Sequence, residues 1–281
     1  MIRQNKHAVR EAFSGASGTY DGASPLQQEV GVSLVSFIRE HCQDALRPQA
    51  QARHEIDANT ARHQGLMLDA GCGTGRLSAA LINEYPGASV IGCDFALPML
   101  VEARRLGATE RLVGADIDAL PFSNGLFSLV ASNLAYQWPP DTLASFREAV
   151  RVLKDGGLLT LSTLGPDTLF ELRESCKAAS MPIAEMGFLR PDEVSAALIK
   201  AGLDVISIES MDFTRQYTDI RSLVLALRNI GAMPKQPNAN HTLIKGALLK
   251  KAGAVYCERF PCPTGGITAT YDVIFVAARK I

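Results

Sequence analysis

The chain has 281 residues, of which 47% are apolar and 20% charged, and its formal net charge at pH 7 is −1. A chain of this size and composition can bury a substantial core, and its length alone allows one large domain or two small ones. No window approaches the roughly 18 uncharged apolar residues of a membrane span, and the N-terminal MIRQNKHAVREAF lacks the apolar centre of a secretory signal, so we expect a soluble, cytoplasmic protein.

The first part of the chain predicts an alternation of strands and helices. A helix is expected over residues 26–42, and a polar linker without apolar periodicity extends from there to Gln64. Strands are then predicted at 66–70, 89–94, 110–116, 126–133 and 156–165, and helices at 75–85, 97–107 and 142–154. Strands that alternate with helices imply a parallel sheet covered by helices on both faces.

After residue 165 the alternation is looser. A helix is predicted at 191–202, a strand at 203–210 and a further helix at 218–231, where Gly231 ends it. The segment 232–240 contains two prolines and two asparagines and is predicted to be a loop. The β-branched and aromatic residues of ITATYDVIFVAAR, residues 267–279, predict a final strand.

The stretch LDAGCGTGRLSAAL, residues 68–81, places three alternating glycines between a strand and a helix. It does not match the dinucleotide fingerprint G-x-G-x-x-G, because Arg76 or Ser78 occupies the position of the third glycine. The pattern is instead D-x-G-x-G-x-G, formed by Asp69 and by Gly71, Gly73 and Gly75. Glycine permits positive φ and close approach of a ligand to the backbone.

Two acids suggest which ligand this turn binds. Asp94 ends the next strand, and in a doubly wound sheet it opens onto the same crevice, where its carboxylate can accept hydrogen bonds from ribose hydroxyls. The charge of Asp69 would repel a pyrophosphate but suits a cation. A ribose, a sulfonium and an ammonium are combined in S-adenosylmethionine, which we therefore predict as the cofactor.

These residues resemble the class I S-adenosylmethionine-dependent methyltransferases, and the resemblance continues along residues 65–165. GADIDALPF looks like the adenine segment of that family, which implies that Asp116 lies toward the exocyclic amine and the Ile117 backbone near the ring. ASNLAYQW looks like the fourth-strand segment, which implies that the backbone from Asn133 to Ala135 lies near the methionine moiety. The fold implied is a doubly wound, mostly parallel, seven-stranded α/β sheet of Rossmann-like type.

Simpler interpretations of three residues remain open. One alternative is that Asp69 merely caps the following turn, and another is that Asp116 is an ordinary acidic residue of a loop. Trp138, the only tryptophan, is followed by two prolines, and we expect it to pack beneath a loop.

The flanking segments resemble a narrower family, the malonyl-[acyl-carrier protein] O-methyltransferases that begin pimeloyl synthesis for biotin. The resemblance rests mainly on STLGPDTLFEL and on LRNIGA, and it spans nearly the whole chain. It implies an N-terminal helical lid and linker over 1–64 and a methyltransferase domain over 65–281. The cofactor half of that domain is expected at 65–165, with substrate and lid insertions, including a late helical one, at about 166–190 and 210–265.

This resemblance implies O-methylation of the free carboxylate of a malonyl thioester. A guanidinium suits that carboxylate, and Arg228 in LRNIGA is the first candidate, although an arginine near a helix C-terminus can also be a plain surface residue. Tyr20 in SGTYD can hydrogen-bond the cofactor carboxylate or the substrate as part of the lid, or it can simply pack. Arg228 and Tyr20 are the predicted substrate-site residues.

The distribution of charge is uneven. Between Ser210 and Ile281 there are ten Lys or Arg residues against four acidic ones. Such a surplus can be a solvated surface or a docking face for an acidic partner, and an acyl-carrier protein is acidic. No interleaved aromatic and basic motif indicates nucleic acid, so none is expected as a partner, and neither is a membrane.

Cysteines and histidines give no sign of a metal site. The six cysteines, at 42, 72, 93, 176, 257 and 262, contain no CxxC pair, and the five histidines are not clustered, so we predict reduced thiols and no metal.

Three rival functions stay open at this point. The first is a methyltransferase for another small carboxylate or a quinone. The second is a relative that acts in respiratory complex I assembly or hydroxylates protein arginine, against which the absence of an Arg- and Ser-rich transit segment argues modestly. The third is a regulator that binds the cofactor without catalysis.

Overall fold

The structure is a computed structural model that describes residues 6–18, 20–46, 64–182, 187–230 and 246–281. Its strands are β1 (Gln64–Ala70), β2 (Ala88–Asp94), β3 (Leu112–Gly114), β4 (Phe127–Asn133), β5 (Leu153–Leu164), β6 (Leu203–Tyr217) and β7 (Ile267–Lys280). Its helices are α1 (Lys6–Ala16), α2 (Tyr20–Ala23), α3 (Pro25–Leu46), α4 (Arg76–Glu84), α5 (Leu97–Arg105), α6 (Thr142–Val152), α7 (Phe170–Ala178), α8 (Pro191–Ala201), α9 (Ile220–Asn229) and α10 (Gly246–Arg259).

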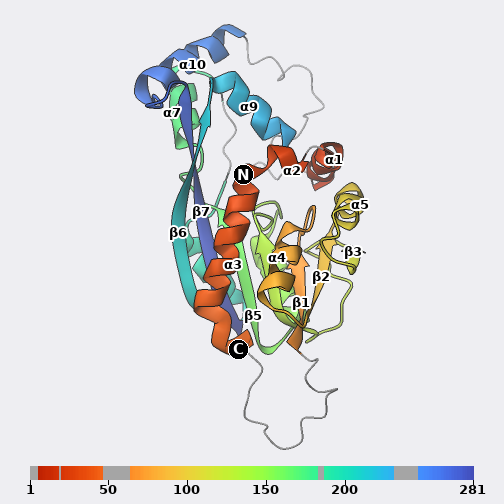
Figure 1. Ribbon diagram of the computed structural model, residues 1–281. Coiled ribbons are helices and arrows are strands. Elements are labelled where there is room, and N and C mark those ends of the chain that lie inside the picture. Colours follow the sequence, from red (N-terminus) through yellow and green to blue (C-terminus); the bar gives the residue numbers. More distant parts are fainter. Residues whose placement is uncertain (1–5, 19, 47–63, 183–186, 231–245) are drawn as a thin grey trace, which may run out of the picture.

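The strands form one sheet in the order β3-β2-β1-β4-β5-β7-β6 (Figure 1). Strands β1 to β5 pair in parallel, whereas β7 runs antiparallel to both β5 and β6. The chain passes from β1 to β2 on one side and later to β4 on the other, so the strand order reverses at β1. In open α/β sheets, ligands bind outside the carboxyl ends of the strands at such a reversal.

Each face of the sheet carries its own apolar core. Successive side chains of a strand point to opposite faces, and in β1 Met67 joins one core while Leu68 joins the other. The first core is completed by α3, α4, α7, α9 and α10, and the second by α6 and α8. The strands read as nearly continuous apolar runs because both of their faces are covered.

The short helices α1 and α2 lie at the end of the sheet where the parallel strands finish, and α9 lies close to α2 (Figure 1). Helix α3, which follows α2 directly, runs along the sheet and buries Leu26, Val30 and Leu34. The buried face of this helix therefore anchors the N-terminal segment next to the strand ends.

The predicted doubly wound, mostly parallel seven-stranded fold is confirmed. Several strands differ in length from their predictions: β3 is limited to Leu112–Gly114, β5 begins at Leu153, and β6 differs most, because it continues to Tyr217 although its sequence becomes polar after Ser210. It pairs with β7 along its whole length, and as the edge strand it exposes one side to solvent, where polar residues are tolerated. The linker before Gln64 and the loop at 232–240 lie outside the described residues. Among the described helices, none is long and apolar enough to cross a membrane.

The glycine turn after β1 gives a test of how the fold is packed. Gly73 and Gly75 both have positive φ, but a Cβ on Gly75 would lie 2.4 Å from the Cβ of Ala108, whereas a Cβ on Gly73 would meet no atom within 4 Å. In Gly73→Ala the free energy of unfolding should therefore fall by about 1–2 kcal/mol, the cost of placing alanine in the left-handed region. In Gly75→Ala it should fall by about 1–3 kcal/mol more, because the added Cβ overpacks the site. Urea unfolding of both variants measures the difference, and equal losses would contradict this packing.

Candidate functional site

The turn between β1 and α4 is fastened to the end of β2. The backbone N–H groups of Gly71 and Cys72 both donate to the carbonyl oxygen of Cys93 at 2.8 Å, and the N–H of Gly73 donates to Asp94 Oδ2 at 3.0 Å. A Cβ on Gly71 would lie 2.6 Å from the Cβ of Ala135, the residue expected near the cofactor. Because the glycines have no side chains, the turn after β1, the end of β2 and the loop after β4 can approach one another closely.

Asp94 closes this turn from β2. Its Oδ1 accepts from the N–H of Ala96 at 2.8 Å, so each carboxylate oxygen has one backbone donor and retains capacity for another. Burial raises the pKa of the Asp94 carboxyl to about 6, although hydrogen bonds from the Ala96 and Gly73 backbone oppose the shift. The carboxylate is oriented for further donors at the rim of the crevice.

Asp69 is buried completely beneath the same turn. Its Oδ2 accepts from Ser78 Oγ at 2.6 Å, whereas Oδ1 has no hydrogen-bond partner among the described residues. Burial raises the pKa of this carboxyl to about 7; the Ser78 hydrogen bond opposes the shift, and the nearby charge of Asp94 adds to it. A buried carboxylate with one oxygen left without a hydrogen bond costs folding free energy, unless a cationic donor pairs with that oxygen.

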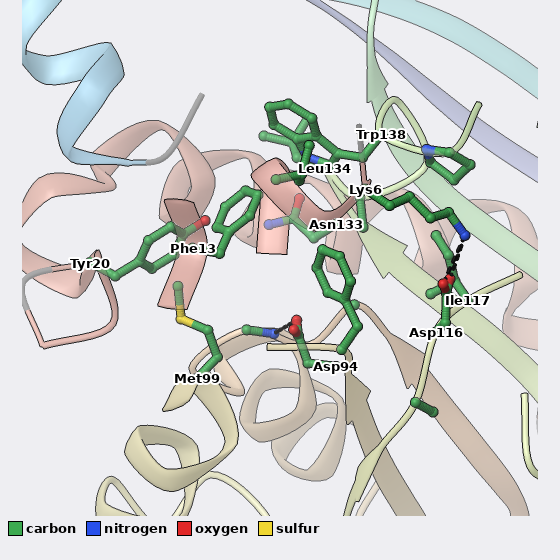
Figure 2. A pocket seen from close by; sticks show the side chains of 17 residues that line it. Lys6, Phe13, Tyr20, Asp94, Met99, Asp116, Ile117, Asn133, Leu134 and Trp138 are labelled. Atoms are coloured by element: carbon green, nitrogen blue, oxygen red, sulfur yellow. Dashed lines mark hydrogen bonds and ion pairs between the residues drawn. The ribbon is translucent and has the colours of Figure 1, made fainter. Parts of the chain in front are cut away.

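A cavity of about 680 Å³, part of it open to solvent, lies between α1 and the strand ends (Figure 2). Its lining comes from the N-terminal helices and from the loops that follow β1 to β4, and consists of Lys6, Val9, Phe13, Tyr20, Gly71, Gly73, Asp94, Phe95, Met99, Ala115, Asp116, Ile117, Asn133, Leu134, Ala135, Trp138 and Pro139.

A smaller, more polar cavity adjoins it and shares Tyr20, Gly71, Gly73 and Asn133. Within the described chain, three buried polar atoms that line it have no hydrogen-bond partner, namely Ser24 Oγ, Gln27 Oε1 and Asp69 Oδ1. Buried polar atoms are normally paired. Two acceptors and a hydroxyl gathered in one place fit the ammonium and carboxylate of an amino-acid group.

The aromatic residues of α1 and α2 cover the larger cavity. Phe13 makes an edge contact with Trp138, with ring centroids 5.4 Å apart, and lies 6.1 Å from the ring of Tyr20. Burial raises the pKa of Tyr20, and the charges of Asp94 and Asp21 add to the shift, so its hydroxyl stays a hydrogen-bond donor. The sequence predicts that Trp138 packs beneath a loop; in the structure Phe13 of α1 packs on it, and both residues line the cavity.

The loop after β3 forms the opposite wall. Asp116 and Ile117 line the cavity there, and the ammonium of Lys6 from α1 donates to both carboxylate oxygens of Asp116, at 3.0 and 2.8 Å. Only one Asp116 oxygen also accepts from a backbone N–H, that of Asp118 at 3.0 Å. The second oxygen therefore keeps capacity for a ligand donor.

Asn133, at the end of β4, links the sheet to the N-terminal segment. Its amide nitrogen donates to the carbonyl oxygen of Gln27 in α3 at 2.8 Å, and its oxygen accepts from Ser162 Oγ at 2.7 Å. The expectation concerned its backbone; in the structure its side chain also sets the position of α3. This places Ser24 and Gln27 over the glycine turn.

The structure thus brings most of the expected residues together at the two cavities: Tyr20, Asp69, Gly71, Gly73, Asp94, Asp116, Ile117, Asn133 and Ala135. Gly75 instead caps α4 and packs on Ala108. Arg228 is exposed near the end of α9 and lines neither cavity.

Several lining residues were not identified from the sequence, chiefly Lys6, Phe13, Ser24 and Gln27. The i, i+3, i+7 spacing of Lys6, Val9 and Phe13 indicates one helix face, but nothing local in the sequence shows what that face covers. No group of three or more His, Cys, Asp or Glu side chains in the described residues is placed to hold a metal ion.

The raised pKa of Asp69 gives a prediction for the protein without ligand. An acid whose pKa is raised on folding destabilises the folded state increasingly as pH rises from about 4, its unfolded value, to about 7, its folded value. Asp69→Asn should therefore raise the Tm above about pH 7, and the gain should disappear as the pH falls to about 4. Thermal unfolding over this pH range measures it.

Asp155→Asn is the matched control, because its side chain is 95% exposed and should show no such pH-dependent gain. A Tm of Asp69→Asn at or below that of the unaltered protein at high pH would contradict a buried, half-satisfied carboxylate.

The chain was compared with known proteins. A family model described as a methyltransferase domain matches residues 67–157, which carry the glycine turn, Asp94 and Asp116. Two solved structures share the fold at low identity: a putative methyltransferase from Bacillus halodurans (20% identity, TM-score 0.55, 76% of this chain and 92% of that one) and the YcgJ protein from Bacillus subtilis (18%, 0.56, 88% and 98%).

Relatives of higher identity match over nearly the whole chain. The malonyl-[acyl-carrier protein] O-methyltransferase of Methylovorus sp. is 35% identical over 98% of this chain and 89% of its own length, and that of Geobacter sulfurreducens is 32% identical over 100% of both. The biotin biosynthesis bifunctional protein BioHC of Saccharophagus degradans is 31% identical over 99% of this chain and 47% of its own length. The chain belongs to the malonyl-[acyl-carrier protein] O-methyltransferase family of S-adenosylmethionine-dependent methyltransferases.

Proposed function

We propose that this protein methylates the free carboxylate of a malonyl thioester carried on acyl-carrier protein, as a step of biotin synthesis. The observation that carries the proposal is the 30–35% identity to enzymes of that name along nearly the whole chain, including the N-terminal helices and the segments after β5. The cavity at the strand ends supports it, because it combines buried acids with an apolar cover.

The residues present fit S-adenosylmethionine. Asp69 Oδ1 and Gln27 Oε1 would accept from its ammonium, and the hydroxyls of Ser24 and Tyr20 would donate to its carboxylate. Asp94 would accept from the ribose hydroxyls with the capacity that its two backbone donors leave free.

The adenine would lie among apolar side chains at the other end of the larger cavity. Asp116 would accept from its exocyclic amine, with the Ile117 backbone beside the ring. The backbone of Asn133 to Ala135 would follow the methionine part, close to Gly71. The whole set spans both cavities, from the polar end beneath α3 to the loop after β3.

When bound, S-adenosylmethionine supplies a methyl group on a positively charged sulfur. A malonyl carboxylate is ionised at neutral pH, since carboxylic acids titrate near about 4, so the protein needs no general base to form the nucleophile. Its task is to align the reacting atoms and to exclude water. Phe13, Trp138 and Leu134 form an apolar cover suited to that task.

Arg228 remains the first candidate for holding the substrate carboxylate. It lies in the last turn of α9, and α9 contacts α2, which carries Tyr20. An exposed guanidinium beside the covering helices suits a substrate that enters from solvent on a carrier.

The helices around it support a docking face for the acidic carrier. Helices α9 and α10 contact each other, as do α10 and α7, and they expose Arg221, Arg228, Lys250, Lys251 and Arg259. Positive charge gathered on neighbouring helices attracts an acidic partner and sets its orientation.

The proposed activity is tested by incubating the protein with S-adenosylmethionine and malonyl-carrier protein and reading the intact mass of the carrier. We expect the carrier to gain one methyl group, whereas acetyl-carrier protein, which has no free carboxylate, should gain none. Free malonate tests whether another small carboxylate is the substrate. Methylation of free malonate but not of the carrier would contradict the proposal.

Arg228→Ala should raise the KM for malonyl-carrier protein and lower kcat by about tenfold, the effect of losing a charge-assisted hydrogen bond. Its affinity for S-adenosylhomocysteine should stay unchanged. Lys200→Ala is the control, since Lys200 is an exposed cation on α8, on the other face of the sheet. Steady-state kinetics and calorimetry measure both variants, and unaltered kinetics would remove Arg228 from the site.

Docking through the basic helices predicts a dependence on salt. The KM for malonyl-carrier protein should rise as ionic strength shortens the screening length from about 10 Å to about 3 Å. The double variant Lys250→Gln/Lys251→Gln should raise that KM at low salt and reduce its salt dependence, with no effect on S-adenosylhomocysteine binding. A KM that is independent of salt in the unaltered protein would rule out this docking face.

A further inference from the structure

Helix α1 covers the larger cavity with one face. Lys6, Val9 and Phe13, spaced at i, i+3 and i+7, all line it, and Val9 is only 2% exposed (Figure 2). The strand ends and their loops form the opposite wall. A ligand in this cavity therefore lies beneath α1.

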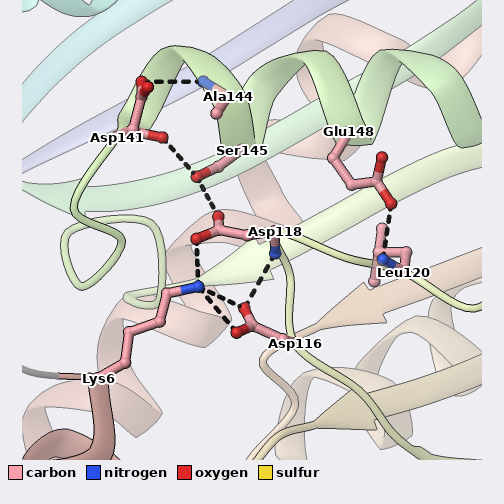
Figure 3. A network of polar contacts seen from close by, with 8 residues as sticks. All are labelled: Lys6, Asp116, Asp118, Leu120, Asp141, Ala144, Ser145 and Glu148. Carbon is pink, nitrogen blue, oxygen red and sulfur yellow. Dashed lines mark hydrogen bonds and ion pairs between the residues drawn. The ribbon is translucent and has the colours of Figure 1, made fainter.

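At the start of α1, Lys6 fastens this cover to the loop after β3. Its ammonium contacts both oxygens of Asp116 and also Asp118 Oδ2 (Figure 3). Burial lowers the pKa of Lys6, but its hydrogen bonds to Asp116 and Asp118 outweigh that effect and raise it, so the ammonium is charged. These charge-assisted contacts join α1 to a loop more than a hundred residues away in the sequence, and Lys6 and Asp116 are 110 residues apart.

Asp118 is a fixed acceptor. Its other oxygen, Oδ1, accepts from Ser145 Oγ at 2.5 Å, and the same hydroxyl lies 2.9 Å from the carbonyl oxygen of Asp141, the N-cap residue of α6 (Figure 3). Asp118 does not line the cavity, whereas Asp116 does. The ion pair with Asp118 can therefore be altered without changing a residue that faces the ligand.

The other end of the N-terminal segment is held more firmly. In α2, Asp21 accepts from Thr74 Oγ1 at 2.6 Å and from Arg76 at 2.9 Å. Helix α2 leads directly into α3, whose Val30 and Leu34 are fully buried in the core. No described residue of α1 belongs to either of the two cores of the sheet, so α1 can separate from the cavity without disrupting those cores.

We propose that Lys6 is a positioning residue that latches α1 over the bound cofactor. S-adenosylhomocysteine, the form of the cofactor left after methyl transfer, then leaves only after Lys6 separates from Asp116 and Asp118. This inference rests on the cofactor assignment of the proposed function. The latch also neutralises the charge of Asp116 and leaves Oδ2, which has no backbone donor, with capacity to accept from the adenine amine, so closure of α1 and adenine recognition stabilise each other.

The test measures the dissociation rate of S-adenosylhomocysteine by stopped flow, with excess S-adenosylmethionine as the competitor that replaces it. Trp138 is the only tryptophan of the chain, lines the cavity and contacts Phe13 of α1, so its fluorescence reports both ligand and cover. Lys6→Met, which keeps the length of the side chain without its charge, should dissociate about tenfold faster, as expected for a partly exposed charge-assisted contact.

Asp118→Asn should also accelerate dissociation, and the double variant Lys6→Met/Asp118→Asn should be no faster than Lys6→Met alone, because the two residues act through one contact. Lys6→Arg should restore slow release. Arg10→Gln is the matched control, an exposed cation of the same helix that does not line the cavity, and it should leave the rate unchanged.

Salt supplies an independent readout that a loss of folding would not mimic. Raising the ionic strength should accelerate dissociation from the unaltered protein but not from Lys6→Met, which has no latch to screen. Equal rates in the unaltered protein and Lys6→Met, or additive effects of the two substitutions, would overturn the latch alone. Failure of the unaltered protein to bind S-adenosylhomocysteine would overturn the cofactor assignment and the latch with it.

Discussion

The site depends on two carboxylates that are buried side by side at the ends of adjacent parallel strands. Asp69 and Asp94 are 0% and 7% exposed, and neither forms an ion pair with a described residue. Burial raises the pKa of both carboxyls, and the charge of Asp94 raises that of Asp69 further. Such a pair costs folding free energy, and a ligand that brings positive charge and hydroxyl donors to the turn offsets the cost.

The rest of the architecture follows from that constraint. Backbone N–H groups of the glycine turn bind the end of β2 and orient Asp94, which leaves one side of each carboxylate oxygen for the ligand. A charged ligand in a shallow crevice would be screened by water, so the acids need a cover. Helices α1 and α2 and the start of α3 provide it, and Asn133 ties that cover to the sheet through Gln27.

The sequence predicts the fold of residues 65–165 well because its signals are local. The apolar runs of β1, β2, β4 and β5 and the glycines between β1 and α4 define the strand ends, and parallel pairing alone then brings Asp69 near Asp94. Asp116 and Ile117, which line the cavity, were predicted from the resemblance of one contiguous segment. A short stretch of sequence therefore indicates both the type of these residues and their position at the strand end.

Contacts between distant segments could not be predicted in the same way. Lys6 meets Asp116 across 110 residues, and Gln27 meets Asn133 across 106, and neither pairing has a local signature. Trp138 lines the cavity beside Phe13 of α1, and the position of α1 over the sheet depends on the anchoring of α3, so no pattern around Trp138 predicts this contact. Arg228 shows the opposite case: its segment is distinctive in sequence, but the residue is exposed and lines neither cavity.

The most direct measurement of the central claim is the proton exchange that accompanies ligand binding. Calorimetric titration with S-adenosylhomocysteine near pH 7, in two buffers of different ionisation enthalpy, reports how many protons are released. Because the pKa of the Asp69 carboxyl is raised to about 7 in the free protein, and an ammonium beside it favours the ionised form, binding should release a fraction of one proton. Binding without proton release, or tight binding of NADH in place of S-adenosylhomocysteine, would contradict a site built for a cationic nucleoside.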